Sequence, residues 1–425
     1  MSSRSRRPLT VTGALLEGRR VGVRCERGTI VSLGPGVTAE AGDETIDADG
    51  AHLVAPLVNG HTHAAMTLFR GHGGDLPLMR WLREVVWPVE ARLEPEDVYW
   101  GARLACLEMI RTGTGRLWDM YWHPEASARA ARDAGLRATI GGPLLDVDGG
   151  TEAMQASALS SLDELERFAP EIGGALAPHA IYTVSEGLLR WAAGLARERG
   201  VPVQIHLSET EQEVRDCIAR HGVRPAFYLD RVGMLSERTV LAHGVWLDRE
   251  ELELIAERGC TVVANPVANM KLAVGGVLPY PAAREAGVAV GLGTDGAGSN
   301  DSLDLLSDLK VFALSQRHAA CDAAVLPAEE AWRIATGARS RLLRDDGRAD
   351  EPLRTGAPAD FLLLRPDSYE LGVGDLYADL VYAASGSVVD TTVVGGRVLM
   401  RGGVVEGAEE VVMRAAERAR RLGIE

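Results

Sequence analysis

His61-Thr62-His63 is a short motif whose two imidazoles could bind one metal ion. The motif follows residues 53–58, an apolar run that is typical of a β-strand. Residues two apart in a strand point to the same face, so both imidazoles can lie on one side of the strand end. Because H-x-H pairs also occur by chance on protein surfaces, the motif needs support from the rest of the chain.

Three later polar residues at the ends of apolar runs supply that support: His206, His243 and Asp295. Three imidazoles and a carboxylate suit one divalent ion, and here they would come from His61, His63, His206 and Asp295. Zn²⁺ is the preferred ion and Fe²⁺ or Mn²⁺ are alternatives, because nitrogen and oxygen ligands discriminate weakly among these metals. Such a set leaves a position for water, whose pKa the cation lowers to about 7, and this predicts hydrolytic chemistry.

Glu209 follows His206 by three residues, so a loop after the strand can bring its carboxyl into the same cavity as a proton carrier. A solvated loop carboxylate is the simpler interpretation of a single Glu. For His179 and His243 the alternative is a core histidine that is hydrogen-bonded to the backbone.

The elements that must position these residues follow a repeated βα pattern, which predicts an α/β fold with a closed (β/α)8 TIM barrel. We assign eight strands to residues 53–58, 116–121, 138–144, 174–177, 201–207, 239–242, 260–264 and 288–293. A polar residue stands at or just beyond the end of each run: His61 with His63, then Asp119, Asp146, His179, His206, His243, Asn265 and Asp295. Catalytic groups of such barrels lie at the carboxyl ends of strands, so one cavity should gather these side chains.

Both terminal segments are rich in β-strand patterns and turns, and neither alone has enough strands to bury a face. We therefore predict that they pair into one small β-sandwich. The expected domains are residues 1–55 for its N-terminal part, 56–350 for the hydrolase barrel, and 351–425 for its C-terminal part with a helix over 406–422.

The composition is that of a globular protein whose partner is a small molecule. The 425 residues contain 45 Lys and Arg against 60 Asp and Glu, so phosphate-based nucleic-acid binding is not expected. The five cysteines are scattered and never in C-x-x-C spacing, which argues against disulfides and a thiolate zinc site. Residues 1–10 lead into no apolar signal segment and no apolar run is long enough to span a membrane, which favours a cytoplasmic location.

Motifs of other chemistries are missing from the sequence. It contains no G-x-S-x-G elbow, no P-loop, no helix-opening G-x-G-x-x-G, and no H-x-E with P-C-x-x-C of the cytidine-deaminase type.

With these residues in place, the sequence resembles the amidohydrolase superfamily, in its branch of methylthioadenosine/S-adenosylhomocysteine deaminases and related triazine chlorohydrolases. The similarity covers nearly the whole chain. Its motifs are PLVNGHTHAAMTLFRG from Pro56, DMY from Asp119, APH to His179, HLSE from His206, AH to His243, NPVANMKL from Asn265, GTDGAGSN from Gly293 and GAPAD to Asp360.

The resemblance implies that His61, His63, His206 and Asp295 hold one metal ion. It also implies that Glu209 protonates the ring nitrogen, that His243 orients the hydroxide, and that Asp295 passes a proton to departing ammonia. Triazine chlorohydrolases tend to lack the Glu and Asp pair that this chain keeps, which favours deamination. A homo-oligomer is a further expectation from the family.

The substrate assignment rests on fewer residues. By resemblance, Glu90 would bind ribose hydroxyls and His179 would contact the nucleoside, although Glu90 could also be a helix-surface residue. Family members that accept S-adenosylhomocysteine can use arginines after the third strand, whereas no Arg lies between Arg137 and Arg167 here. A neutral 5′ group is therefore favoured, as in methylthioadenosine, 5′-deoxyadenosine or adenosine.

Three hypotheses follow from these observations. The first is a metal-dependent deaminase that converts the 6-amino group of an adenosine-type nucleoside to a 6-oxo group. The second is a hydrolase of another amino-heterocycle, such as a pterin, oxidised guanine or aminotriazine, including a chlorohydrolase-like enzyme. The third is a barrel without catalysis that serves binding or assembly, which the complete set of site residues disfavours.

Overall fold

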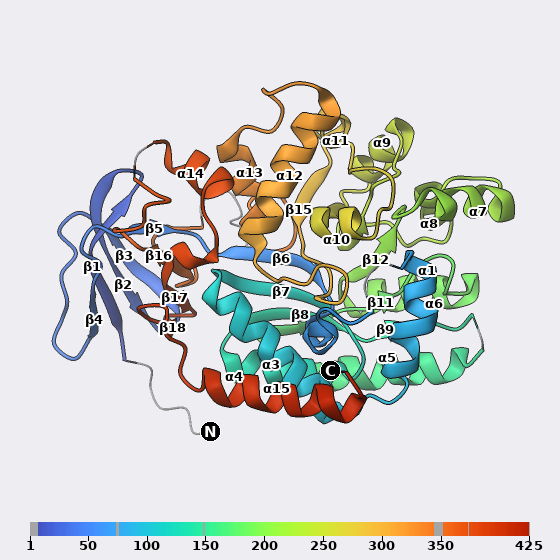
Figure 1. Ribbon diagram of the computed structural model, residues 1–425, viewed down its shortest axis with the longest axis horizontal. Helices are drawn as coiled ribbons and strands as arrows, with labels where there is room; N and C mark the ends of the chain where they lie inside the picture. The colour runs from blue at the N-terminus through green and yellow to red at the C-terminus, as the bar shows by residue number, and fades with distance from the viewer. Residues whose placement is uncertain (1–6, 74–75, 148, 344–351, 373, 425) are drawn as a thin grey trace.

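Largely buried strands alternate with helices through the middle of the chain and form the wall of a barrel (Figure 1). The computed structural model describes residues 7–73, 76–147, 149–343, 352–372 and 374–424. One parallel sheet has the order β10-β8-β7-β6 and a second has the order β12-β13-β14-β15. Their bounds are β6 Leu57–Thr62, β7 Thr114–Met120, β8 Arg137–Gly141, β10 Ile172–Gly174, β12 Val203–Leu207, β13 Thr239–His243, β14 Thr261–Ala264 and β15 Ala289–Leu292.

The two sheets meet at both edges. At one edge, β8 is followed by the short strand β9 Pro143–Leu144 and β10 by β11 Ala177–Pro178, and these two short strands pair. Parallel bridges then join Leu176 to Val203 and Ala180 to His206, which connects this edge to β12. At the other edge β15 packs beside β6, and the backbone N–H of Asp295 donates to the carbonyl of His61 at 3.0 Å. Gly293 permits this approach, because a Cβ there would lie 2.9 Å from the backbone of His61. The predicted (β/α)8 barrel is thus confirmed.

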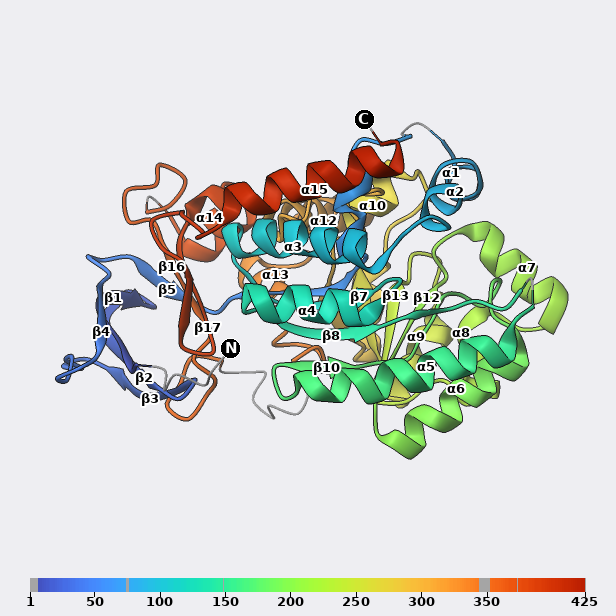
Figure 2. The ribbon, with the colours of Figure 1, turned by 90° about the horizontal axis from the view of Figure 1, so that it is seen from below.

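Helices cover the outside of the barrel (Figure 2). Their bounds are α1 Leu78–Trp81, α2 Trp87–Glu90, α3 Pro95–Arg111, α4 Pro124–Ala134, α5 Thr151–Leu165, α6 Glu186–Arg199, α7 Glu211–His221, α8 Pro225–Arg231, α9 Arg249–Glu257, α10 Pro266–Lys271, α11 Tyr280–Ala286, α12 Leu305–Ala320, α13 Ala328–Ala335, α14 Leu376–Tyr382 and α15 Ala408–Leu422. The 3₁₀ turns are η1 Ala64–Phe69, η3 Glu166–Phe168 and η5 Gly386–Val388, and η2 Leu82–Val86 is a π-helix.

The predicted strand at residues 53–58 is divided between two sheets. Residues His52–Val54 form β5 of the terminal sheet, whereas the barrel strand β6 begins at Leu57. Pro56 separates them, because it lacks the N–H that a continuous strand needs for its ladder. The predicted boundary at residues 55 and 56 lies in this short junction and stays a prediction. The predicted boundary at residues 350 and 351 lies outside the described residues.

The two terminal segments pair, as expected, into one eight-stranded sheet at the end of the barrel (Figure 1). Its order is β18-β17-β16-β5-β1-β2-β3, with β4 beside β1. The antiparallel pair of β16 and β5 joins the two termini, with Leu363 opposite Leu53. The remaining bounds are β1 Leu9–Leu16, β2 Arg19–Glu26, β3 Thr29–Gly34, β4 Glu44–Asp47, β16 Phe361–Leu364, β17 Val389–Val394 and β18 Arg397–Met400.

The C-terminal helix α15 leaves this sheet and lies along α3 of the barrel (Figure 2). Arg421 of α15 forms an ion pair with Asp97, which is fully buried at the start of α3, and it donates to the carbonyl of Arg92 at 3.0 Å. Among the described residues, no helix combines the length and the apolar character that a membrane crossing needs.

Candidate metal centre and active site

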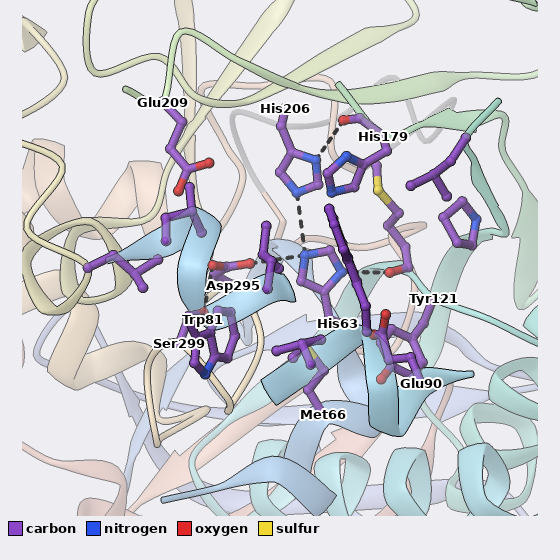
Figure 3. Close-up of a pocket in the computed structure, with 18 of the residues that line it drawn as sticks. His63, Met66, Trp81, Glu90, Tyr121, His179, His206, Glu209, Asp295 and Ser299 are labelled. Atoms are coloured by element: carbon purple, nitrogen blue, oxygen red, sulfur yellow. Dashed lines mark hydrogen bonds and ion pairs between the residues drawn. The ribbon is translucent and has the colours of Figure 1, made fainter. Parts of the chain in front are cut away.

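The four side chains predicted to bind metal come together at the carboxyl ends of the barrel strands. Figure 3 shows three of them, His63, His206 and Asp295. His61 lies near the end of β6, His63 directly after β6, His206 within β12 and Asp295 three residues after β15. One ligand atom from each of these four residues lies within 4.8 Å of the others. The distances are 3.2 Å from Asp295 Oδ1 to His63 Nε2 and 3.5 Å to His61 Nε2, and 3.3 Å between Nε2 of His63 and His206.

These four residues fit a divalent ion. His61 Nε2 and Asp295 Oδ1 are buried, and neither atom has a hydrogen-bond partner among the described residues. A buried polar atom without a partner is costly, and a cation between the ligands would satisfy both atoms. Imidazole nitrogens and carboxylate oxygens are ligands that suit Zn²⁺ and other divalent transition metals.

Hydrogen bonds behind the ligands orient them. Nδ1 of His63 donates to the carbonyl of Met120 at 2.6 Å, and Nδ1 of His206 donates to the carbonyl of His179 at 2.7 Å. Each bond uses Nδ1 as the donor and leaves Nε2 directed towards the centre, where it could bind a cation. The Ser299 hydroxyl donates to Asp295 Oδ2 at 2.7 Å, so the other carboxylate oxygen faces the imidazoles.

Glu209 and His243 line the same pocket as the predicted metal ligands His63, His206 and Asp295. Glu209 is 5% exposed, and burial raises its pKa to about 8, with a further increase from the charge of Asp295. Burial also lowers the pKa of His243, so its imidazole is neutral. Its Nδ1–H donates to Asn269 Oδ1 at 2.8 Å, which leaves Nε2 as an acceptor. The pocket thus combines a protonated carboxyl with a neutral imidazole.

Glu90 and His179 also lie on the wall of this pocket, beside the metal group. Nδ1 of His179 lies 2.8 Å from the hydroxyl of Thr183. Glu90 ends helix α2 and lies next to Tyr121 (Figure 3). Trp122 is a second neighbour of its carboxyl group. Burial raises the pKa of Glu90, and the neighbouring polar groups of Trp122 and Tyr121 offset only part of this increase.

A π-helical turn places Glu90 and much of the apolar wall. In η2 the N–H of Trp87 bonds to the carbonyl of Leu82, one residue further back than in an α-helix. Pro88 explains the wider turn, because it has no N–H for the carbonyl of Glu84 and its ring would clash with that group.

The space between the pocket walls, open mouth included, is about 730 Å³. Its apolar side is formed largely by the η1 to α2 region: Met66, Leu78, Trp81, Leu82, Val86 and Trp87. No Arg or Lys is among the described residues that line it.

The sequence analysis assigned no role to several residues that the structure brings to the site. Tyr121, Asn269 and Ser299 belong to the motifs listed above, but the motifs do not show which side chains they contact. In the structure Tyr121 lines the pocket, Asn269 binds His243 and Ser299 binds Asp295. Glu213 had a different signal, since Thr210 and Glu213 match the S/T-x-x-E pattern of a helix start. Its side chain instead accepts the N–H groups of Ser208 and Glu209.

Comparison with known proteins identifies the class. Residues 53–399 match the model of the amidohydrolase family. The chain therefore belongs to the amidohydrolase family and is a hydrolase that acts on C–N bonds, which confirms the resemblance seen in the sequence.

Particular members of the family are similar over most of their length. The 5′-deoxyadenosine deaminase of Methanoregula boonei is 45% identical over 89% of this chain and 86% of its own. The 5-methylthioadenosine/S-adenosylhomocysteine deaminase 1 of Archaeoglobus fulgidus is 40% identical over 91% and 92%. The crystal structure of an adenosine deaminase from Xanthomonas campestris with bound zinc superimposes with a TM-score of 0.90 at 32% identity, covering 98% of both chains.

Proposed function

We propose that this enzyme is a zinc-dependent deaminase that replaces the 6-amino group of an adenosine-type nucleoside with an oxo group and releases ammonia. The observation that carries the proposal is that the group of His61, His63, His206 and Asp295 borders one pocket with Glu209 and His243, with His63, His206 and Asp295 on the pocket wall. The relatives named as deaminases of 5′-deoxyadenosine and methylthioadenosine support this substrate class.

The side chains supply the proton transfers of this reaction. A zinc ion held by the four ligands would make water nucleophilic at neutral pH. Asp295 accepts a proton from the attacking water, and neutral His243 orients that water through Nε2. Protonated Glu209 donates to the ring nitrogen next to carbon 6, which makes that carbon a better electrophile.

The same groups complete the product. Once the new C–O bond has formed, Asp295 passes its proton to the amino group and the C–N bond breaks to release ammonia. The remaining hydroxyl proton returns to Glu209 as the C=O bond forms, so both carboxyl groups regain their starting states. One water is consumed. One of its protons leaves with ammonia and the other restores Glu209, while the ring nitrogen of the 6-oxo product keeps the proton that Glu209 donated.

A neutral 5′ substituent suits the pocket better than a homocysteine group. The wall lacks an Arg or Lys among the described residues, and its apolar side chains would remove water from the charged amino-acid end. An unpaired carboxylate without water is unfavourable. Glu90 lies beside Tyr121 on the pocket wall, and we propose that it accepts hydrogen bonds from the ribose hydroxyls.

Ammonia release and the purine ultraviolet shift test the proposal on zinc-loaded protein. The substrates are adenosine, methylthioadenosine, 5′-deoxyadenosine, S-adenosylhomocysteine, guanine and pterin. We expect kcat/KM for the neutral nucleosides to exceed that for S-adenosylhomocysteine by about 10- to 100-fold, the penalty of one unpaired polar group. Activity on free bases alone would contradict the nucleoside assignment.

A further inference from the structure

Glu213 lies in the first turn of α7, and its carboxyl group is bonded to the chain segment that carries Glu209. The backbone N–H of Ser208 donates to one carboxyl oxygen and the N–H of Glu209 donates to the other, both at 2.9 Å. Glu213 is 5% exposed, so water hardly competes for these bonds. One side chain therefore binds both residues of the turn that leads into the pocket.

The turn needs such support because of its backbone conformation. Ser208 has φ +50°, in the left-handed region that residues with a side chain seldom adopt, and it is fully buried. The carbonyls on the other side of the turn are also bonded, since Gly244 N–H donates to Leu207 and Trp246 N–H donates to Ser208. Glu213 thus completes a set of bonds that holds the turn from two directions.

Capping of the helix does not explain this arrangement. The N-cap residue of α7 is Thr210, whose hydroxyl already accepts the N–H of Glu213 at 3.2 Å. In an ordinary capping box the Glu side chain would bind the N–H of Thr210. Here the carboxyl reaches past Thr210 to the two preceding residues. Its contacts therefore favour a role in placing Glu209.

We propose that Glu213 is a positioning residue for deamination: by binding both N–H groups of the Ser208–Glu209 turn, it fixes the Glu209 carboxyl in the pocket. Figure 3 shows Glu209 directed towards the pocket from this segment. The inference rests on the proposed role of Glu209 as proton donor.

Glu213→Gln tests the proposal, because it keeps the shape and replaces one acceptor oxygen with an NH₂ donor that opposes a backbone N–H. We expect kcat to fall about 10- to 100-fold, the loss that a shift near 1 Å in a catalytic group can cause. KM should stay within about twofold and metal content should be unchanged, since neither the ligands nor the substrate wall is altered.

A double-mutant cycle with Glu209→Gln separates positioning from a general structural effect. If Glu213 acts through Glu209, adding E213Q to E209Q should change kcat by less than about twofold. The same full loss from E213Q in both backgrounds would overturn this proposal alone. An E209Q enzyme with wild-type kcat would instead overturn the proposed role of Glu209, and this proposal with it.

Asp97→Asn is the matched control, because Asp97 is also a buried carboxylate in the first turn of a helix. It accepts the N–H of Glu94 at 2.8 Å and pairs with Arg421, on a different βα unit. We expect D97N to lower the melting temperature and to keep kcat. A kcat loss in D97N equal to that in E213Q would make the effect one of stability and would overturn the proposal.

If E213Q folds poorly, the test moves to a Ser208→Gly background, because glycine adopts the left-handed conformation without strain. S208G/E213Q should fold and have a kcat about tenfold below that of S208G, since the two N–H groups are no longer held. Equal kcat values for S208G and S208G/E213Q would overturn the proposal.

Discussion

Three residues at the strand ends of the site adopt left-handed backbone conformations without being glycine. They are Ser208 with φ +50°, His243 with φ +75° and Asp295 with φ +62°. Each such residue costs about 1–3 kcal/mol, and the cost is tolerated where the surrounding structure fixes the conformation. A neighbouring side chain binds each of them: Glu213 accepts the N–H of Ser208, Asn269 binds the His243 ring and Ser299 donates to Asp295. These bonds hold the three residues in their left-handed conformations.

Glu90→Ala tests the proposed contact with ribose. Loss of the carboxylate should lower kcat/KM for adenosine-type nucleosides by about 10- to 100-fold, because a charged acceptor of two hydroxyl hydrogen bonds is removed. Turnover of free amino-heterocycles, measured by ammonia release, should be unaffected. An unchanged nucleoside rate would refute the assignment of Glu90.

The pH dependence of kcat/KM tests the role of Glu209. A proton donor works in its acid form, and burial raises the pKa of Glu209 to about 8. Activity should therefore fall as pH rises through this pKa, and a bound cation would move the fall to lower pH because it favours the carboxylate. Glu209→Gln should keep its metal, lose about 10²- to 10⁴-fold in kcat and lack this alkaline decrease. Metal loss in E209Q, measured by elemental analysis, would contradict the assigned role.

At the scale of elements, close packing outside the barrel fixes the segment after His63. Helix α3 packs against η1, which follows the metal motif, and Gly101 is the contact point. A Cβ at Gly101 would lie 2.6 Å from the carbonyl oxygen of Ala65. The Thr67 hydroxyl donates to the Gly101 carbonyl at 2.7 Å, so the two elements are bonded as well as packed.

Gly101→Ala should therefore destabilise the protein although alanine favours helices. We expect the free energy of unfolding to fall by about 1–3 kcal/mol, as for other overpacked sites. Gly194→Ala in α6 is the matched control, because no atom lies within 4 Å of the added Cβ, and it should be stabilising by about 0.5–1 kcal/mol. Denaturant unfolding measures both changes, and equal effects would refute the packing argument.

At the scale of the whole molecule, the candidate metal group joins the two halves of the barrel wall. His61 and His63 come with β6 from one sheet, whereas His206 and Asp295 come with β12 and β15 from the other. Without a cation, unpaired polar atoms are buried between the sheets. Metal binding should therefore be coupled to the stability of the entire barrel.

Removal of metal with a chelator should lower the melting temperature, and added Zn²⁺ should restore it. At free zinc about 1,000-fold above Kd, binding would contribute about 4 kcal/mol to stability. His206→Asn should remove most of this zinc-dependent shift because it deletes one of the four ligands. Identical melting curves for metal-free and zinc-loaded wild-type protein would contradict the proposed site.

The expected homo-oligomer stays a prediction that sedimentation can check.

The sequence alone was sufficient for the barrel and for the metal group. Short apolar runs alternated with helical patterns, and the carboxyl ends of parallel strands meet at one end of a barrel. Polar residues at those ends, such as His61, His206 and Asp295, were therefore expected in one cavity whatever the exact strand bounds. Periodicity and position relative to a strand are local properties, which a sequence displays directly.

Tertiary structure decided the features that depend on contacts between distant residues or on single backbone angles. The division of residues 53–58 between two sheets depends on strand partners, since β5 pairs with β16 from the other terminus. Helix α15 packs on α3 through contacts between residues far apart in the sequence, among them the pair of Arg421 with Asp97. Thr210 and Glu213 match the sequence pattern of a helix cap, but the Glu213 carboxyl binds the N–H groups of Ser208 and Glu209, because hydrogen-bond partners depend on distance in space.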